Sequence, residues 1–219
     1  MFESINAIDT YILLWVHDNH IPILDWLMPF ITDQDNWIIP ILFLILFLGF
    51  FSNKKGRIAL ALLVIALSCN DFICAQILKP FFERVRPSHI SLDGLNLLVS
   101  RGGKWSMPSN HASNVFTLTV VLSYFYGKTK LPLYLLATFI SFSRVYVGVH
   151  YPGDVIAGGL FGYSSAHNEP LENPWTKYLK DKNKLVRIIT NSRIEKYICI
   201  SCPGCRSKEN VLFGIYFLY

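Results

Sequence analysis

Apolar runs separated by short polar turns make up most of this chain. Residues 37–51, 58–78, 111–126 and 131–147 are almost wholly apolar. Because an α-helix rises 1.5 Å per residue, runs of this length approach what a hydrocarbon core of ~30 Å requires, with some tilt. The pattern therefore predicts four membrane-spanning helices.

The two ends of the chain depart from this pattern. Residues 2–18 and 21–31 mix apolar and polar positions at helical spacing, which is typical of helices at a membrane surface. A fifth apolar stretch begins at Asp154 and fails after about ten residues, too few to cross a bilayer as an isolated helix. We therefore expect three regions: interfacial helices at 1–35, a transmembrane core at 36–163, and a polar, basic, cytoplasmic tail at 164–219.

The composition agrees with a membrane protein. Apolar residues make up 52% of the 219 residues and charged residues only 16%, whereas a soluble domain carries nearer a quarter charged residues. No cleavable signal peptide is expected, because residues 1–18 lack a small-residue cleavage site. The predicted fold class is an all-α, polytopic transmembrane bundle of about five to six helices with N-terminal interfacial helices.

The formal charge of +5 suggests the orientation of the chain more than a partner. No basic face alternates with exposed aromatic residues, so nucleic acid is not an expected partner. Lysines in the turns at 54–57 and 128–130 predict that these turns are cytoplasmic. The loop at 79–110 and the turn at 145–153 then face outward together.

The five cysteines fall into two groups. Cys69 and Cys74 lie within an apolar run and are expected to act as small core residues. Cys199, Cys202 and Cys205 form a C-x-x-C-x-x-C pattern that has no fourth partner at ligand spacing. A zinc or cluster site there stays open as an alternative, and we expect no metal.

Three polar clusters lie at the edges of the apolar runs: residues 79–87 (KPFFERVRP), 108–111 (PSNH) and 143–154 (SRVYVGVHYPGD). Together they offer fixed cations, two histidines, a serine and a carboxylate. This set suits a dianionic phosphate ester that is attacked by an imidazole. The chemistry would take place at a membrane surface.

His150 and Asp154 form the first candidate catalytic pair. Pro152 lies between them, at a position where proline favours the start of a helix. A carboxylate in that first turn can reach back to the imidazole, fix one ring nitrogen as a donor and leave the other free as a nucleophile. The alternative is a hydrogen-bonded structural histidine.

His111 and Ser109 form the second candidate group. Free backbone N–H groups at a helix start bind anions, and the Ser109 hydroxyl adds a donor. A histidine beside bound phosphate can protonate the leaving oxygen. The alternative for Ser109 is an ordinary helix N-cap.

Lys79, Arg86 and Arg144 are the candidate phosphate ligands. Arginine donates to two phosphate oxygens at once, and lysine supplies a compact point charge. The alternative for Lys79 and Arg86 is that they extend to the water at a membrane edge. Arg84 has no expected role in phosphate binding, and Glu83 is its expected surface partner.

The three clusters read K-x6-RP, PSNH and SR-x5-H-x3-D in chain order. This resembles the type 2 phosphatidic acid phosphatase superfamily, whose pattern is K-x6-RP, PSGH and SR-x5-H-x3-D. The resemblance covers roughly residues 20–163. It implies a membrane helical bundle that removes phosphate from a lipid.

The resemblance also implies a role for each matched position. In that family the positions that match Lys79, Arg86 and Arg144 bind phosphate. The position of His150 forms a phosphohistidine intermediate and is oriented by the position of Asp154.

The position of His111 acts as the acid, and that of Ser109 helps to hold phosphate. No metal or cofactor is implied. Asn110 stands where the family has glycine; it keeps its N–H and tolerates unusual backbone angles, so we expect it to take part in the phosphate site. The short fifth span also departs from the family, which puts the packing behind Asp154 in doubt.

The leading hypothesis is an integral-membrane, metal-independent lipid phosphatase of a bacterial inner membrane, acting on the outer face. Substrates that the resemblance suggests are undecaprenyl diphosphate, phosphatidylglycerol phosphate, phosphatidic acid and lipid A 1-phosphate. Two alternatives stay open: a lipid phosphotransferase with the same phosphohistidine, and a membrane lipid-binding protein without activity. The apolar spans argue against a soluble vanadium haloperoxidase. The oligomeric state is not predicted.

Overall fold

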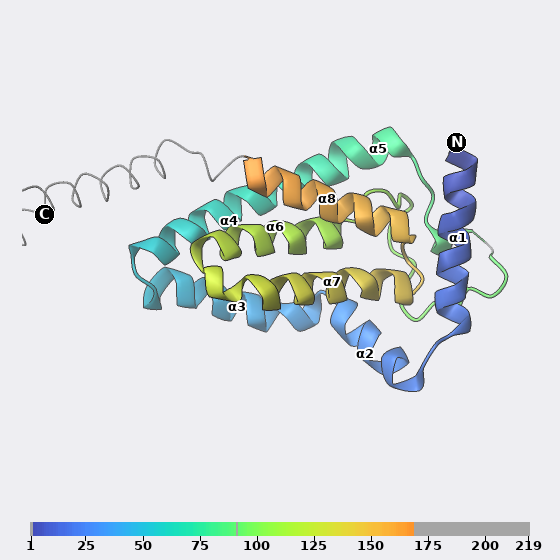
Figure 1. The fold of residues 1–219 in the computed structure, drawn as a ribbon, viewed down its shortest axis with the longest axis horizontal. Coiled ribbons are helices and arrows are strands. Elements are labelled where there is room, and N and C mark those ends of the chain that lie inside the picture. The colour runs from blue at the N-terminus through green and yellow to red at the C-terminus, as the bar shows by residue number, and fades with distance from the viewer. Residues whose placement is uncertain (1, 91, 169–219) are drawn as a thin grey trace, which may run out of the picture. The chain divides into compact units, whose positions relative to one another are not determined.

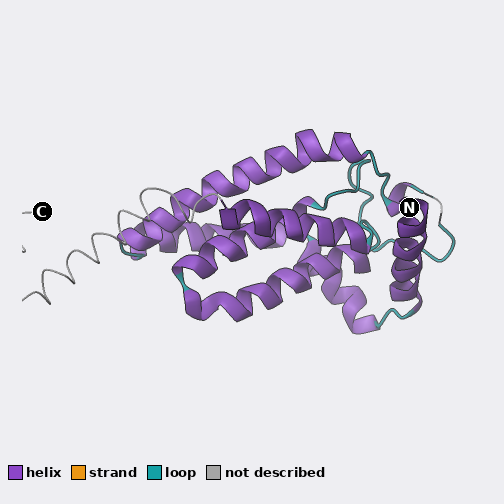
Figure 2. Ribbon diagram, turned by 45° about the horizontal axis from the view of Figure 1, so that its top comes forward, coloured by secondary structure: helices purple, strands orange, loops and turns teal. Residues whose placement is uncertain are grey.

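The computed structural model describes residues 2–90 and 92–168. Every regular element in this part of the chain is helical, and Figure 2 shows no strand there. The prediction of an all-α fold is confirmed for these residues. Almost all of the predicted tail at 164–219, including the three late cysteines, lies outside them.

Two helices precede the bundle: α1 is Phe2–Asp18 and α2 is Pro22–Thr32. The bundle is then built from five helical rods (Figure 1). These are a rod made of η1 (Asp35–Trp37), α3 (Ile38–Leu46) and η2 (Phe47–Phe51); a rod made of α4 (Lys54–Phe72), η3 (Ile73–Leu78) and α5 (Lys79–Phe82); and the single helices α6 (Asn110–Phe125), α7 (Lys130–Tyr146) and α8 (Pro152–Asn168).

The rods match the predicted apolar runs closely, but their lengths differ. The rod Lys54–Phe82, with 29 residues, is long and apolar enough to cross a membrane. The pair Pro22–Thr32 and Asp35–Phe51 meets the same criterion together, although the two are bent by 69° at their junction. The single helices α6 to α8 have 16 or 17 residues, about 25 Å at 1.5 Å per residue, a little short of a ~30 Å core. Membrane crossing by these three helices stays a prediction.

The last helix extends beyond the apolar stretch that ends near residue 163. Helix α8 continues to Asn168 through a polar sequence. The Ser164 hydroxyl donates to the Leu160 carbonyl at 2.7 Å, and Ser165 donates to the Gly162 carbonyl at 3.2 Å, so these side chains are satisfied within the helix. Hydropathy alone does not register this compensation.

Helix α8 lies directly against α6, which supplies the packing behind Asp154 that the sequence left in doubt. A Cβ atom at Gly158 would lie 2.4 Å from the Ser109 carbonyl oxygen, and one at Gly162 would lie 2.1 Å from that of Ser113. Only glycine permits the two backbones to approach so closely.

Asn70, which interrupts the second apolar run, joins three helices. It is 1% exposed, its amide donates to Asn114 at 2.7 Å, and its oxygen accepts from Ser113 at 2.8 Å and from Ser165 at 3.3 Å. Buried polar groups are tolerated when they are paired in this way. Asn70 therefore connects α4, α6 and α8.

The two inner cysteines do not share one environment. Cys74 is buried and its thiol donates to Ser113 at 3.5 Å, as expected of a small core residue. Cys69 is exposed, so its assignment to the core is wrong.

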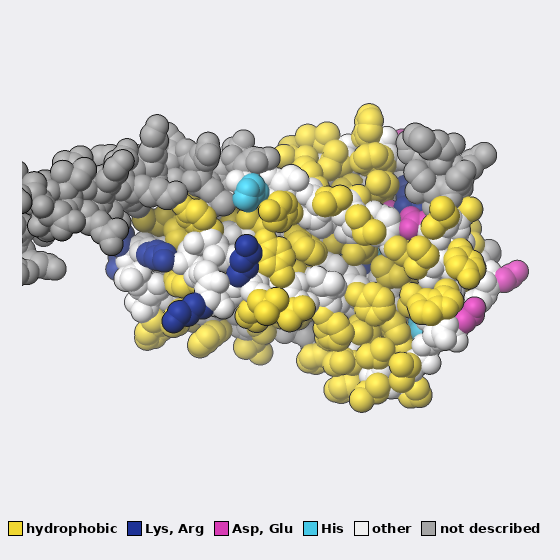
Figure 3. Space-filling model, viewed as in Figure 1, with side chains coloured by type: hydrophobic (Ala, Val, Ile, Leu, Met, Phe, Trp, Pro, Cys, Tyr) yellow, Lys and Arg dark blue, Asp and Glu magenta, His cyan; other side chains and the backbone are white. Residues whose placement is uncertain are grey.

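The two lysine-bearing turns and the long loop lie at opposite ends of the bundle. Lys55 lies over the Tyr126 ring at 5.7 Å, so the two lysine-bearing turns meet at one end. The long loop 83–109, the end of α7 and the start of α8 gather at the other end, near α1 (Figure 1). Figure 3 shows apolar side chains over much of the face turned to the viewer. Exposed apolar residues of α7 and α8 include Leu131, Leu135, Ile156 and Leu160.

Candidate active site

A cavity of about 1370 Å³ opens where the three polar clusters meet. Six of the eight predicted site residues line it: Lys79, Arg86, Asn110, His111, Arg144 and His150. They come from α5, the long loop, the start of α6, the end of α7 and the turn before α8. Ser109 and Asp154, both 0% exposed, lie behind this lining.

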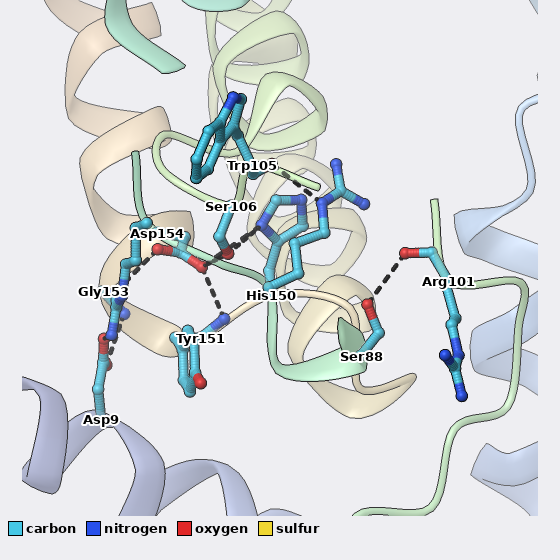
Figure 4. Close-up of polar contacts among 11 residues, drawn as sticks. Asp9, Ser88, Arg101, Trp105, Ser106, His150, Tyr151, Gly153 and Asp154 are labelled. Atoms are coloured by element: carbon cyan, nitrogen blue, oxygen red, sulfur yellow. Dashed lines mark hydrogen bonds and ion pairs between the residues drawn. The ribbon is translucent and has the colours of Figure 1, made fainter. Parts of the chain in front are cut away.

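His150 is held by the turn that joins α7 to α8. Gly148 in this turn has a φ of +82°, which favours glycine, and the backbone N–H of His150 donates to the Arg144 carbonyl at 3.2 Å. The Nδ1 atom lies 3.4 Å from the Asp154 carboxylate and 3.4 Å from the Ser106 hydroxyl (Figure 4). Within the described part of the chain no hydrogen bond to Nε2 is found, so that nitrogen is free to react.

The ring of His150 is kept neutral by its surroundings. Burial is the main cause that lowers its pKa, to about 4, and Arg86 and Arg144 lower it further while Asp154 opposes them. At neutral pH the ring therefore carries no charge. A neutral imidazole with a proton on Nδ1 has a lone pair on Nε2, as a nucleophile requires.

Asp154 is the most heavily contacted carboxylate at the site. Its Oδ2 accepts from the Tyr151 N–H at 2.8 Å and from the Ser106 hydroxyl. Its Oδ1 accepts from Arg84 Nη1 at 2.8 Å. These donors hold the carboxylate ionised and fixed beside His150.

The expected pairing of Arg84 with Glu83 is therefore wrong. Arg84 forms ion pairs with Asp154 and, at 2.7 Å, with Asp9 of helix α1, and its guanidinium lies 4.2 Å from the Tyr151 ring centroid. The Arg84 side chain points inward because its ion pairs with two buried carboxylates are stronger than a pair with an exposed neighbour would be.

The two arginines at the cavity are oriented by polar groups from other segments. Arg86 Nε donates to the Trp105 carbonyl at 3.1 Å. Arg144 Nη1 donates to the Thr32 hydroxyl at 2.7 Å and to the Thr32 carbonyl at 3.3 Å. The buried Nε of Arg144 has no partner in the described part of the protein, which leaves this donor available to a ligand.

The start of α6 presents His111 and its neighbours. Ser109 occupies the N-cap position of α6, but its hydroxyl makes no capping bond and has no partner among the described residues, which leaves this hydroxyl available to a ligand. Asn110 has an ordinary backbone, and its amide donates to Asp71 at 2.9 Å, so the unusual angles that glycine would permit are not needed here. A 3.2 Å contact joins His111 Nε2 to the side-chain amide of Gln34.

Five residues that support the site were missed from the sequence: Asp9, Thr32, Gln34, Arg84 and Ser106. Of these five, only Arg84 could have been proposed from the sequence, because it lies within the first polar cluster. The other four come from segments far from their partners along the chain.

Away from the charged groups the cavity becomes apolar. It continues along α3, α6 and α7, lined by side chains that include Ile41, Val115, Leu118, Leu133, Leu136 and Ile140. The polar part of the lining also includes the carboxylates Asp33, Asp35 and Asp71. The cations beside the two histidines, together with the apolar lane, suit a ligand with an anionic head and a hydrocarbon chain.

Comparison with known proteins places the chain among lipid phosphatases. A model of the PAP2 superfamily matches residues 55–168. The lipid A 4'-phosphatase of Bacteroides thetaiotaomicron is 34% identical over 171 residues, which cover 74% of this chain and 75% of that protein. The undecaprenyl-diphosphatase of Sulfolobus acidocaldarius is 36% identical over 152 residues, which cover 67% and 69%. The crystal structure of Aquifex aeolicus LpxE is similar with a TM-score of 0.59 and 28% identity, covering 72% of this chain and 92% of that one.

Proposed function

The chain belongs to the PAP2 superfamily and is a phosphatase, and from this premise we propose that it removes phosphate from a membrane lipid through a phosphohistidine on His150. One observation carries the proposal: a single cavity combines two histidines and three cations at one end with an apolar lane at the other. The first group suits phosphoryl transfer and the second suits a lipid chain.

In the first step, Nε2 of His150 attacks phosphorus while the bond from phosphorus to the lipid oxygen breaks. His111 gives its proton to that leaving oxygen. Lys79, Arg86 and Arg144 stabilise the charge on the remaining phosphate oxygens. Asp154 stabilises the positive charge that develops on the His150 ring.

In the second step, His111 takes a proton from water, and the water oxygen attacks phosphorus. The P–N bond breaks, phosphate leaves, and His150 returns to its neutral form with Nδ1 protonated. His111 ends protonated, ready for the next substrate. No metal takes part in either step.

The substrate and the location follow from the same premise. The relatives are named for lipid A and undecaprenyl diphosphate, so lipids with a phosphate or diphosphate head are the proposed substrates. We place the cavity at the outer face of a bacterial inner membrane, because the lysine-bearing turns lie at the opposite end of the bundle. Region 36–163 forms the proposed transmembrane core.

The test is phosphate release by the purified protein in detergent, with EDTA present, from a panel of lipid A, undecaprenyl diphosphate, phosphatidylglycerol phosphate and phosphatidic acid. Activity that survives EDTA and disappears in His150→Ala supports the proposal. His167→Ala, an exposed histidine at the far end of α8, is the matched control and keeps full activity. Unchanged activity of His150→Ala contradicts the proposed phosphohistidine. Product analysis with and without an added acceptor lipid separates hydrolysis from phosphotransfer.

A further inference from the structure

Helix α1 has two faces of different character. The outward face is apolar and aromatic, with Ile8, Tyr11, Ile12 and Trp15 exposed. The inward face is buried, with Asp9, Leu13, Val16 and His17 at helical spacing. The helix crosses the end of the bundle at which α7 ends and α8 begins (Figures 1 and 2).

Asp9 is the acidic residue of the inward face, and it meets the catalytic turn directly. Its Oδ1 accepts from the backbone N–H of Gly153 at 2.8 Å, beside Asp154 (Figure 4). A Cβ atom at Gly153 would lie 2.6 Å from Asp9 Oδ2, so the turn and the carboxylate are in close contact. Asp9 is only 5% exposed.

Arg84 connects Asp9 to Asp154. Its Nη2 lies 2.7 Å from Asp9 Oδ2, and its Nη1 lies 2.8 Å from Asp154 Oδ1. One arm of this rigid guanidinium makes a hydrogen bond to Asp154 and the other makes an ion pair with Asp9, so the group couples the positions of the two carboxylates. The Tyr151 ring under the guanidinium restricts it further, at 4.2 Å.

We propose that Asp9 and Arg84 are positioning residues for the catalytic pair, so that helix α1 sets the place of Asp154 and, through it, the orientation of His150. The inference rests on the proposed function, because it assigns the two residues to the same reaction. Neither residue lines the cavity, so neither touches the substrate.

The geometry explains why such support matters. The contact between His150 Nδ1 and Asp154 is 3.4 Å, at the long limit for a hydrogen bond, so a small shift of the carboxylate breaks it. A misplacement of about 1 Å at a reacting group can cost on the order of a hundredfold in rate. Arg84 and Asp9 also form a buried charge pair that loses its balance when either is neutralised.

The experiment measures kcat and KM of full-length Asp9→Asn, Arg84→Gln, Arg84→Lys and the double variant Asp9→Asn/Arg84→Gln, on the panel lipid that the wild type hydrolyses. Asparagine keeps the oxygen that accepts from Gly153, removes the charge and places an NH₂ group, which cannot accept, against Arg84. Asp18→Asn and Arg101→Gln are matched controls, since both residues are exposed and lie on the same helix and the same loop.

Each single neutral variant lowers kcat by about 10- to 100-fold and changes KM by less than about threefold. Arg84→Lys keeps the charge but not the fork and falls between the wild type and Arg84→Gln. In the double variant, Asp9→Asn adds less than about threefold to the effect of Arg84→Gln, because Asp9 acts through Arg84. The controls stay within about twofold of the wild type.

The acid limb of kcat/KM separates positioning from a loss of folded protein. The groups that face His150 are Asp154, Arg86, Arg144 and His111. Removing the Arg84 cation leaves the charge of Asp154 less compensated, which raises the pKa of His150 and moves the limb to higher pH. Removing the Asp9 anion leaves Arg84 less compensated, which lowers that pKa and moves the limb to lower pH. Loss of folded protein lowers the rate without moving the limb.

The inference is overturned if Asp9→Asn matches Asp18→Asn while the wild type is active, or if the two variants are fully additive. A wild type that is inactive on the whole panel contradicts the proposed function instead. The two failures are therefore distinguishable.

Discussion

Replacing Asp154 with asparagine tests the chemistry of the catalytic pair most directly. Asp154 is 0% exposed and accepts from Tyr151, Ser106 and Arg84. An amide has one oxygen, so its NH₂ group must face either the guanidinium or the Tyr151 N–H and the ring of His150. In the first orientation Arg84 loses its acceptor, and in the second Tyr151 and Ser106 both do, at about 1–3 kcal/mol for each donor; in either case Arg84 loses one of its two carboxylates.

The catalytic loss is larger than the loss of stability. If the NH₂ group donates to Nδ1 of His150, the ring proton moves to Nε2 and the nucleophilic lone pair is lost. Fixing the wrong tautomer in a comparable pair lowers kcat on the order of 10⁴-fold. We therefore expect Asp154→Asn to reduce kcat by about 10³- to 10⁴-fold and the free energy of unfolding by about 2–4 kcal/mol.

The assay is initial-rate phosphate release in detergent, well below the melting temperature, with thermal unfolding measured in parallel. Asp93→Asn, an exposed carboxylate of the long loop, is the control. A kcat for Asp154→Asn within tenfold of the wild type would refute the assigned role of the carboxylate, whatever its effect on stability.

Three further predictions test other parts of the structure. His150 has a pKa of about 4 in the folded protein and near 6.5 in the unfolded chain, so the unfolded chain binds the extra proton first as the pH falls. The free energy of unfolding therefore falls by up to about 3 kcal/mol between pH 6.5 and pH 4, and His150→Gln makes this pH dependence weaker in thermal melts. Thr32→Val removes the 2.7 Å acceptor of Arg144 and is expected to lower kcat/KM about tenfold, whereas Thr138→Val, an exposed control on α7, leaves it unchanged. Gly162→Ala places a methyl group 2.1 Å from the Ser113 carbonyl and is expected to destabilise the protein by about 1–3 kcal/mol in thermal unfolding; Gly127→Ala, with open space around its Cβ, is the comparison, and equal melting temperatures would contradict the close packing of α6 and α8.

The helices could be predicted from the sequence because their signals are local. An apolar run limited by lysine-rich turns is decided by the residues within it, so the rods at 35–51 and 54–82 and helices α6 and α7 were located to within a few residues. The sequence signal for the start of α8 is also local, since proline, here Pro152, is favoured at the first helical position.

The polar end of α8 had no such local signal, and part of what stabilises it there comes from a neighbouring helix. The polar end of α8 is helical because Ser164 and Ser165 bond to its own carbonyls and because Asn70 accepts from Ser165. The hydropathy of residues 164–168 carries no information about such a partner. Gly158 and Gly162 gave no signal until α6 was found beside them.

The sequence by itself determined the candidate reactive groups: the spacing of three short motifs singled out the two histidines, the three cations and the carboxylate that the structure brings together. Only the tertiary structure decided what holds them. Arg84 pairs with Asp154 and not with Glu83, the partner expected from the sequence. Asp9, Thr32 and Gln34 come from the N-terminal helices and the segment that follows them. The physical reason is that a buried charge takes whichever partner the packing brings within about 3 Å. These partners are 70 to 112 positions apart along the chain, so their distance is decided only when the chain has folded.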